Sequence, residues 1–384
     1  MRRVIILGAT GSIGMQALEV VSAGSDLTVV GLSCGSRVKR LVEQAMALGV
    51  TEVAVADETA AAGISRALYP EIHVRSGPGA AARLVREVEA DLVLNAIVGF
   101  AGLEATVACL EEGRPLALAN KESLVSGGRV VTGLAEARGV TIVPVDSEHS
   151  ALFQLVAGQD RSTVRSLVLT ASGGPFRGCT VEQLRGVGPA EALAHPTWTM
   201  GAKITVDSAT LMNKGLELIE AHHLFGVPYE DIEVVIHPQS LVHALVRLAD
   251  GTLLAHLGPA DMRVPIAYAL HYPQRRQIAV PRLDLAAVGC LEFQAPDPDT
   301  FRCLALARQA GEAGDAATCA LNAANEVAVR AFLDGRLSFL GIPEVIEQVL
   351  ETTDVPSPTS YAEVAALDAW AREQAERAVG GVGG

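Results

Sequence analysis

The chain has 384 residues, of which 49% are hydrophobic and 19% charged, and its formal net charge is −14. This length corresponds to two or three domains of roughly 100–200 residues, which can bury their cores without a disulfide or a metal ion. An acidic chain lacks the basic footprint of nucleic-acid-binding proteins, and 4% aromatic residues leave few side chains for stacking on bases. The composition therefore predicts a globular protein whose main partner is not a nucleic acid.

The cysteine pattern and the apolar segments predict a cytoplasmic location. Six scattered cysteines form no CxxC pair, which indicates reduced and mostly buried thiols. Residues 1–7 superficially resemble a signal peptide, but a glycine-rich segment and Glu19 follow at once, so a β-strand is expected there. No run of about 18 uncharged apolar residues is present, and we expect no membrane span.

The first 145 residues alternate β-rich and helix-like runs, which predicts an α/β domain with a Rossmann-like, doubly wound parallel sheet. The expected strands are residues 3–7, 28–32, 53–56, 72–75, 91–95, 116–119 and 140–145. The expected helices between them include residues 14–21, 38–48, 79–88 and 103–111.

The pattern changes after residue 145, and residues 146–271 are expected to form an α+β catalytic, metal-binding domain. One helix is predicted over residues 209–224 with Ser208 as its N-cap, and Asp250-Gly251 predicts a hairpin turn. Its expected strands are residues 168–170, 233–237, 241–248 and 252–257. Prolines mark residues 272–299 as a linker. Residues 300–384 are expected to form a C-terminal helical bundle with helices at 304–313, 317–334, 342–351 and 361–379.

A glycine-rich turn follows the first strand and opens a helix, with the spacing GxxGxxG from Gly8 to Gly14. Glycines let the backbone approach a pyrophosphate, and the helix N-terminus supplies N–H donors. The context favours dinucleotide binding, while the alternative is an ordinary glycine-rich strand-to-helix turn.

The end of the second strand favours NADP(H) over NAD(H). An NAD site has an acidic residue there, whereas this chain has Gly35, Ser36 and Arg37, whose hydroxyl and guanidinium suit a 2′-phosphate. The alternative is that Arg37, with Lys39 and Arg40, begins a solvated helix.

Carboxylates that follow another predicted strand indicate a cation site. Asp146 and Glu148 are two residues apart and would share one face of an extended chain, while Glu217 and Glu220 lie on the predicted 209–224 helix. All-oxygen ligands suit Mg²⁺ or Mn²⁺. The alternative is that Asp146 and Glu148 only cap the following helix.

An anion site is indicated by Ser172 with Gly173-Gly174 and by Asn213 and Lys214 on the helix that carries Glu217. Asn213 and Glu217 are four residues apart and should lie on the same face of the helix. Lys214 considered by itself is expected to be a solvent-facing lysine.

Seven motifs, spread in order over nearly the whole chain, resemble those of the 1-deoxy-D-xylulose 5-phosphate reductoisomerase family. They are ANKESLV (119–125), PVDSEHS (144–150), TASGGPF (170–176), HPTWTMG (195–201), VDSATLMNKGLE (206–217), HPQS (237–240) and ALNAANE (320–326).

The resemblance implies rearrangement and NADPH-dependent reduction of 1-deoxy-D-xylulose 5-phosphate to 2-C-methyl-D-erythritol 4-phosphate, in non-mevalonate isoprenoid synthesis, by a homodimer. It implies that Asp146, Glu148 and Glu217 bind the metal, that Ser172, Ser208, Asn213 and Lys214 bind the phosphate, and that Lys121, Ser147 and His195 contact the substrate. The implied NADPH ligands are Thr10, Gly11, Ser12, Ile13, Gly35, Ser36, Arg37, Asn120, Glu122 and Gly201, and the implied lid residues are Trp198 and Met200.

The chain departs from many relatives at Ser36-Arg37, which concerns the 2′-phosphate contacts. It also departs at two lid positions, Thr197 and Thr199, where we expect only altered loop dynamics. Aspartate-semialdehyde dehydrogenase would need a cysteine nucleophile at an Asn/Ala/Ser-rich junction, and a short-chain dehydrogenase would need a YxxxK pair; neither pattern is present. A non-catalytic NADP-sensing module stays open as an alternative.

Overall fold

The computed structural model describes residues 1–64, 69–198 and 200–382, and the chain folds into two compact units. The first unit comprises residues 1–123, 131–150 and 261–280, and the second comprises residues 124–130, 151–260 and 281–384. The sequence predicted four segments with boundaries at residues 145, 271 and 299. The two compact units group the chain differently, and the predicted division stays a prediction.

The first unit is built on a seven-stranded parallel sheet with the order β4-β3-β2-β1-β5-β6-β7. The strands are β1 (Arg2–Leu7), β2 (Leu27–Cys34), β3 (Glu52–Val55), β4 (His73–Ser76), β5 (Leu92–Asn95), β6 (Leu116–Leu118) and β7 (Ile142–Pro144). This confirms the predicted doubly wound sheet. The strand order reverses between β1 and β5, and ligands of such sheets bind at the carboxyl ends of the strands next to that point.

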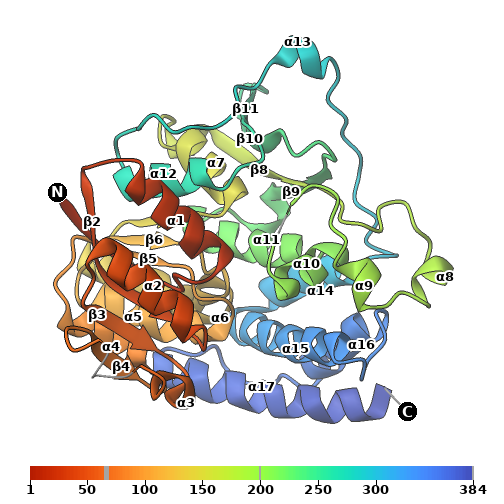
Figure 1. Cartoon of the computed structure of the whole chain (residues 1–384). Helices are drawn as coiled ribbons and strands as arrows, with labels where there is room; N and C mark the ends of the chain where they lie inside the picture. The colour runs from red at the N-terminus through yellow and green to blue at the C-terminus, as the bar shows by residue number, and fades with distance from the viewer. Residues whose placement is uncertain (65–68, 199, 383–384) are drawn as a thin grey trace. The chain divides into compact units, whose positions relative to one another are not determined.

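Apolar strands make the centre of this sheet. Val4, Ile5, Ile6 and Leu7 on β1 are fully buried, as expected for a strand with helices over both faces. The first unit contains α1 (Ser12–Ser22), α2 (Val38–Leu48), α3 (Glu58–Ala61), α4 (Ala80–Glu87), η1 (Phe100–Gly102), α5 (Leu103–Glu111) and α12 (Arg263–His271). The helices α1 and α12 pack side by side although they are far apart in the chain (Figure 1).

Two helices contain residues of both units. These are α6 (Glu122–Arg138), which is interrupted at Gly128 by a non-helical backbone with φ 33°, and α7 (Ser147–Val156).

The second unit contains a four-stranded sheet with the order β11-β10-β8-β9. Its strands are β8 (Val164–Ala171), β9 (Ile232–Ile236), β10 (Val242–Leu248) and β11 (Leu253–Leu257). The β8–β9 pair is parallel and the other pairs are antiparallel. The hairpin predicted at Asp250-Gly251 is confirmed, since Gly251 has φ 88° and Leu248 N–H donates to Thr252 O at 2.8 Å.

The helix predicted over residues 209–224 is present, but it begins three residues later than predicted, and the prediction of Ser208 as its N-cap is wrong. Two helices, α10 (Ala202–Ala209) and α11 (Met212–Phe225), are separated by Leu211 with φ 60°, and Ser208 lies inside α10 rather than at an N-cap. The break has a local cause: the Thr210 hydroxyl bonds back to carbonyl oxygens of α10 and accepts the Met212 N–H at 3.3 Å. Such side-chain bonds compete with the helical ladder.

The predicted helical C-terminal region is confirmed, but it shares one apolar core with a face of the four-stranded sheet. The blue helices of Figure 1 are α14, α15, α16 and α17; α14 packs on the green α11, and α15 packs on the green α10 and on α16 and α17. The long helices are α14 (Arg302–Ala313), α15 (Asp315–Leu333), α16 (Gly341–Glu351) and α17 (Tyr361–Val382). Shorter elements are η2 (Arg161–Thr163), α8 (Val181–Leu184), α9 (Pro189–Ala192), η3 (Tyr229–Asp231) and α13 (Leu285–Val288), the last inside the predicted linker.

All six cysteines are free thiols and four are buried, as predicted. Among the described residues no helix is both long and apolar enough to cross a membrane.

Candidate active site

The glycine loop lies between β1 and α1, and close backbone packing explains two of its glycines. Gly8 has φ 75°, and a side chain there would bring its Cβ within 2.5 Å of the Ala96 carbonyl oxygen; at Gly14 the Cβ would come within 2.4 Å of the Gly8 carbonyl oxygen. The N-cap of α1 is Gly11, which has no side chain to cover the first amides of the helix. The loop thus satisfies both interpretations: it is a tight turn, and it presents a helix N-terminus suited to an anion.

The ends of the glycine loop and of β2 are joined by Ser33. Its hydroxyl accepts the Gly8 N–H at 3.0 Å and its carbonyl oxygen accepts the Ala9 N–H at 2.8 Å. The next residues are accessible: Ser36 and Arg37 are both exposed, and Arg37 is the N-cap of α2. The candidate 2′-phosphate ligands therefore follow the carboxyl end of β2, as predicted. Thr10 is buried and Ser12 is exposed.

A buried polar network lies at the carboxyl ends of β5 and β6, around Asn120. The Asn120 amide donates to Gly99 O at 2.9 Å and to Glu122 Oε2 at 2.8 Å, and its oxygen accepts the Ser123 N–H. The Ser123 hydroxyl also bonds the Thr106 hydroxyl at 2.9 Å. Sequence reasoning found Asn120 and Glu122 but did not single out Ser123, although it lies in the same ANKESLV motif, or Thr106, which lies on α5 outside any quoted motif.

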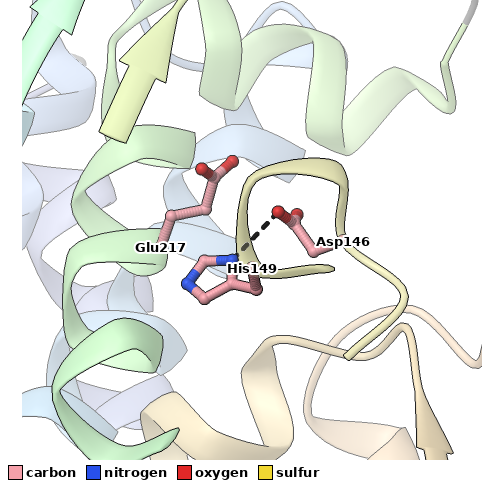
Figure 2. Close-up of side chains that lie close together, drawn as sticks. All are labelled: Asp146, His149 and Glu217. Atoms are coloured by element: carbon pink, nitrogen blue, oxygen red, sulfur yellow. Dashed lines mark hydrogen bonds and ion pairs between the residues drawn. The ribbon is translucent and has the colours of Figure 1, made fainter. Parts of the chain in front are cut away.

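Asp146 precedes α7 and bonds two cationic or titratable neighbours. Its Oδ2 lies 2.8 Å from Lys121 Nζ, and its Oδ1 lies 2.9 Å from His149 Nδ1, the bond drawn as a dashed line in Figure 2. His149 is fully buried and was not predicted as a site residue, although its position three residues after Asp146 at a helix start is a usable signal.

The extended-chain argument for Asp146 and Glu148 is wrong. A helix begins at Ser147, and Asp146 Oδ1 accepts the Glu148 N–H at 3.2 Å, so Asp146 caps α7. The Glu148 carboxylate accepts a hydrogen bond from the Ser147 hydroxyl. Capping and cation binding are compatible, because a carboxylate offers about four lone-pair sites.

In the second unit, Glu217 is buried on α11 and is labelled in Figure 2. Each of its two carboxylate oxygens has a different hydrogen-bond partner. Asn213 Nδ2 donates to Oε1 at 2.5 Å, which confirms their shared helix face, and Lys214 Nζ donates to Oε2. The interpretation of Lys214 as a solvent-facing lysine is wrong, since it is 3% exposed. Glu220 is also buried on this helix.

Ser172 and His195 form the second polar centre of this unit. His195 Nδ1 accepts the backbone N–H groups of Thr197 and Trp198 at 3.1 and 2.9 Å, so the ring proton resides on Nε2, which lies 3.0 Å from the Ser172 hydroxyl. Burial lowers the pKa of His195. The neutral ring is therefore the favoured form near neutral pH.

The loop after β8 lies against the last turn of α10. Gly174 has φ 65°, and a side chain there would bring its Cβ within 2.7 Å of the Ser208 carbonyl oxygen. The structure thus brings the Ser172 loop and Ser208 together. Gly201 is the exposed N-cap of α10, and Trp198 and Met200 are half-buried before it. Thr199 lies outside the described residues.

His243, the second residue of β10, is a further polar residue that sequence reasoning missed. It is 8% exposed, and burial lowers its pKa, with an added contribution from the nearby charge of Lys214. A histidine between apolar residues at the start of a predicted strand was the available signal.

Family models match the chain along most of its length. A model described as 1-deoxy-D-xylulose 5-phosphate reductoisomerase matches residues 4–128, one for its C-terminal domain matches residues 142–225, and one for a DXP reductoisomerase C-terminal domain matches residues 257–374.

Curated relatives named 1-deoxy-D-xylulose 5-phosphate reductoisomerase match over nearly the full length. The protein from Symbiobacterium thermophilum is 50% identical over 378 residues, 97% of each chain. That from Rhodococcus jostii is 52% identical over 381 residues, which cover 98% of this chain and 94% of the relative.

Solved structures agree with this. A crystal structure of DOX-P reductoisomerase in complex with NADPH, fosmidomycin and magnesium has a TM-score of 0.94 at 38% identity and covers 99% of this chain and 98% of its own. The Zymomonas mobilis 1-deoxy-D-xylulose 5-phosphate reductoisomerase in complex with NADPH has a TM-score of 0.91 at 40% identity and covers 98% of this chain and 99% of its own. With identity of this level over the whole fold, the chain belongs to the 1-deoxy-D-xylulose 5-phosphate reductoisomerase family.

Proposed function

We propose that this chain catalyses the NADPH- and divalent-metal-dependent isomerisation and reduction of 1-deoxy-D-xylulose 5-phosphate to 2-C-methyl-D-erythritol 4-phosphate, a step of the non-mevalonate isoprenoid precursor pathway. The observation that carries the proposal is identity of about one half to proteins of this name over 97% of the chain.

NADPH is the proposed cofactor of the first unit. The tight Gly8–Gly14 turn and the uncovered N-terminus of α1 suit a pyrophosphate, and the hydroxyl and guanidinium after β2 suit a 2′-phosphate. The proposed ligands are Thr10, Gly11, Ser12, Ile13, Gly35, Ser36, Arg37, Asn120, Glu122 and Gly201.

Asp146, Glu148 and Glu217 are the proposed ligands of Mg²⁺ or Mn²⁺. Their donor atoms are all carboxylate oxygens, the ligands that these hard cations prefer, so the residues fit the ion. When bound, the cation polarises a carbonyl group and NADPH supplies a hydride.

The proposed phosphate ligands are Ser172, Ser208, Asn213 and Lys214. Lys214 brings a buried positive charge, and the others bring hydrogen-bonding groups from the β8 loop and from both sides of the α10–α11 break. Holding the phosphate fixes the reacting carbons by binding energy from a remote group.

Lys121, Ser147 and His195 are proposed to contact the reacting part of the substrate. His195 is suited to donate a hydrogen bond from Nε2, because its Nδ1 is fixed as an acceptor by two backbone amides. Trp198 and Met200 are proposed to cover the bound substrate as part of a lid. We further propose that the protein is a homodimer, as the resemblance to its family implies, and that it is cytoplasmic, as the pattern of its cysteines indicates.

The test is NADPH oxidation by the purified protein with 1-deoxy-D-xylulose 5-phosphate, after chelator treatment, with and without added Mg²⁺ or Mn²⁺. We expect oxidation only with substrate and metal together. Tight NADPH binding without oxidation under any of these conditions would overturn the proposal and favour a non-catalytic NADP-sensing module.

A further inference from the structure

Asp207 is a buried carboxylate directly before Ser208, and both of its oxygens have partners. Its side chain is 1% exposed, Oδ2 lies 2.9 Å from Lys203 Nζ one turn earlier on α10, and Oδ1 accepts a 2.8 Å hydrogen bond from Asn325 Nδ2 on α15. Asn325 is fully buried, and 118 positions separate the pair in the chain. Neither residue belongs to the proposed binding set, so this pair needs an explanation of its own.

The pair lies beside the junction on which the proposed phosphate site depends. The Ser208 carbonyl oxygen accepts the Leu211 N–H at 3.2 Å, which starts the turn into α11, and the Gly174 backbone lies against it on the other side. The first turn of α11 carries Asn213 and Lys214. Displacement of the last turn of α10 would therefore move Ser208 relative to these two residues.

The position of α10 depends on tertiary contacts, because a helix of eight residues is too short to be stable by itself. It packs on α15, and within that contact the Asp207–Asn325 bond is directional. Removing the Asn325 amide would delete a hydrogen bond to a buried charged group while the Lys203 ion pair remains, so the helix would shift to regain a donor.

We propose that Asp207 and Asn325 are positioning residues for recognition of the substrate phosphate. Their hydrogen bond holds the α10–α11 junction in the position where Ser208, Asn213 and Lys214 can bind the same phosphate group. A helix of the C-terminal region thereby takes part in substrate recognition without touching the substrate. This proposal rests on the proposed function, and it concerns recognition of the phosphate group of the substrate.

The test compares kcat/KM for 1-deoxy-D-xylulose 5-phosphate with kcat/KM for its phosphate-free analogue, 1-deoxy-D-xylulose. Competitive inhibition by inorganic phosphate serves as a second readout. For Asn325→Ala we expect preference for the phosphorylated substrate to fall by roughly 10-fold or more and the phosphate inhibition constant to rise in parallel, since small misplacements of binding groups have effects of this size. The dissociation constant for NADPH should change less, by no more than a few-fold, because all the proposed NADPH ligands except Gly201 lie in the first unit.

Arg372→Met is the matched control. Arg372 on α17 pairs at 2.7 Å with Glu326, the residue after Asn325 on α15, so this variant also loosens α15 but on its α17 side. It should lower the melting temperature and leave the preference unchanged. If it changes the preference as much as Asn325→Ala does, or if Asn325→Ala lowers kcat/KM equally for both substrates, the pair has only a general structural role and the proposal is overturned.

A second pair of variants, in which the amide and the carboxylate are exchanged, tests the proposal if Asn325→Ala does not fold. Asn325→Asp alone places two carboxylates together and should reduce the preference, whereas Asn325→Asp combined with Asp207→Asn restores an amide–carboxylate bond and should recover most of it. An unchanged preference in Asn325→Asp, or no recovery in the double variant, would contradict the proposal. A wild-type protein that shows no turnover would instead refute the proposed function, so the two failures are distinguishable.

Discussion

Lys121 and Asp146 form an ion pair with Nζ 2.8 Å from Oδ2, although they lie 25 positions apart in the chain. They meet because Lys121 follows β6 and Asp146 follows β7, and these are adjacent parallel strands whose carboxyl ends lie at one edge of the sheet. Both side chains are nearly buried, with 9% and 13% exposed. The carboxylate is thus held in a fixed orientation by a cation and by His149.

Asp146→Asn should weaken Mn²⁺ or Mg²⁺ binding, measured by titration calorimetry, because it removes a charged ligand. It should lower metal-dependent kcat/KM by roughly 100-fold or more, because less of the cation that acts as the Lewis acid would be bound. Asp160→Asn is the control, because Asp160 caps the short η2 turn at the surface. Equal metal affinities of Asp146→Asn and wild type would remove Asp146 from the ligand set.

Glu217→Gln should abolish turnover while the NADPH affinity stays within a few-fold, because it removes a proposed ligand without touching the nucleotide-binding unit. Glu220→Gln on the same buried helix is the matched control and should keep metal-dependent activity. Fluorescence titration with NADPH and the metal-dependent oxidation rate measure the two effects. A near-normal rate in Glu217→Gln would refute its role as a ligand.

Arg37→Ala should raise the dissociation constant for NADPH by about 10- to 100-fold and that for NADH much less, since a charge-assisted bond contributes about 1.5–3 kcal/mol. Arg40→Ala, on the same helix and bonded instead to the Met15 sulfur, should leave the NADPH/NADH ratio unchanged. Equal losses for the two cofactors in Arg37→Ala would mean that the 2′-phosphate is bound elsewhere.

His223 should make the protein less stable in acid. Burial lowers its pKa to about 4, and the charges of His222 and Arg129 act in the same direction while Asp315 opposes them. Because the folded pKa lies below the unfolded value of about 6.5, the contribution is complete above pH ~6.5 and is lost as the pH falls through about 4.

Urea unfolding between pH 4 and pH 7 measures this effect, which should be a few kcal/mol at about 1.4 kcal/mol per pKa unit. His223→Gln should flatten the pH dependence, and His73→Gln, at an exposed histidine, should not. An identical pH dependence in His223→Gln and wild type would show that other groups control acid unfolding.

The sequence by itself determined the features that depend on short-range pattern. The helices Val38–Leu48 and Leu103–Glu111 have the predicted bounds. The strands of the parallel sheet begin and end within a few residues of the prediction. Alternating apolar runs and glycine turns specify such elements locally. Ordered motifs over the whole chain also sufficed to indicate the family.

The tertiary structure decided the features that depend on a partner far away in the chain. Lys214 is buried beside Glu217 instead of solvated, and Asp146 caps a helix where an extended chain was expected. Asp207 and Asn325 meet across 118 positions, which neither motif predicts by itself. Burial and hydrogen-bond partners are fixed only when helices and strands pack together, because a polar side chain takes the partner that packing brings to it and no local pattern encodes that choice.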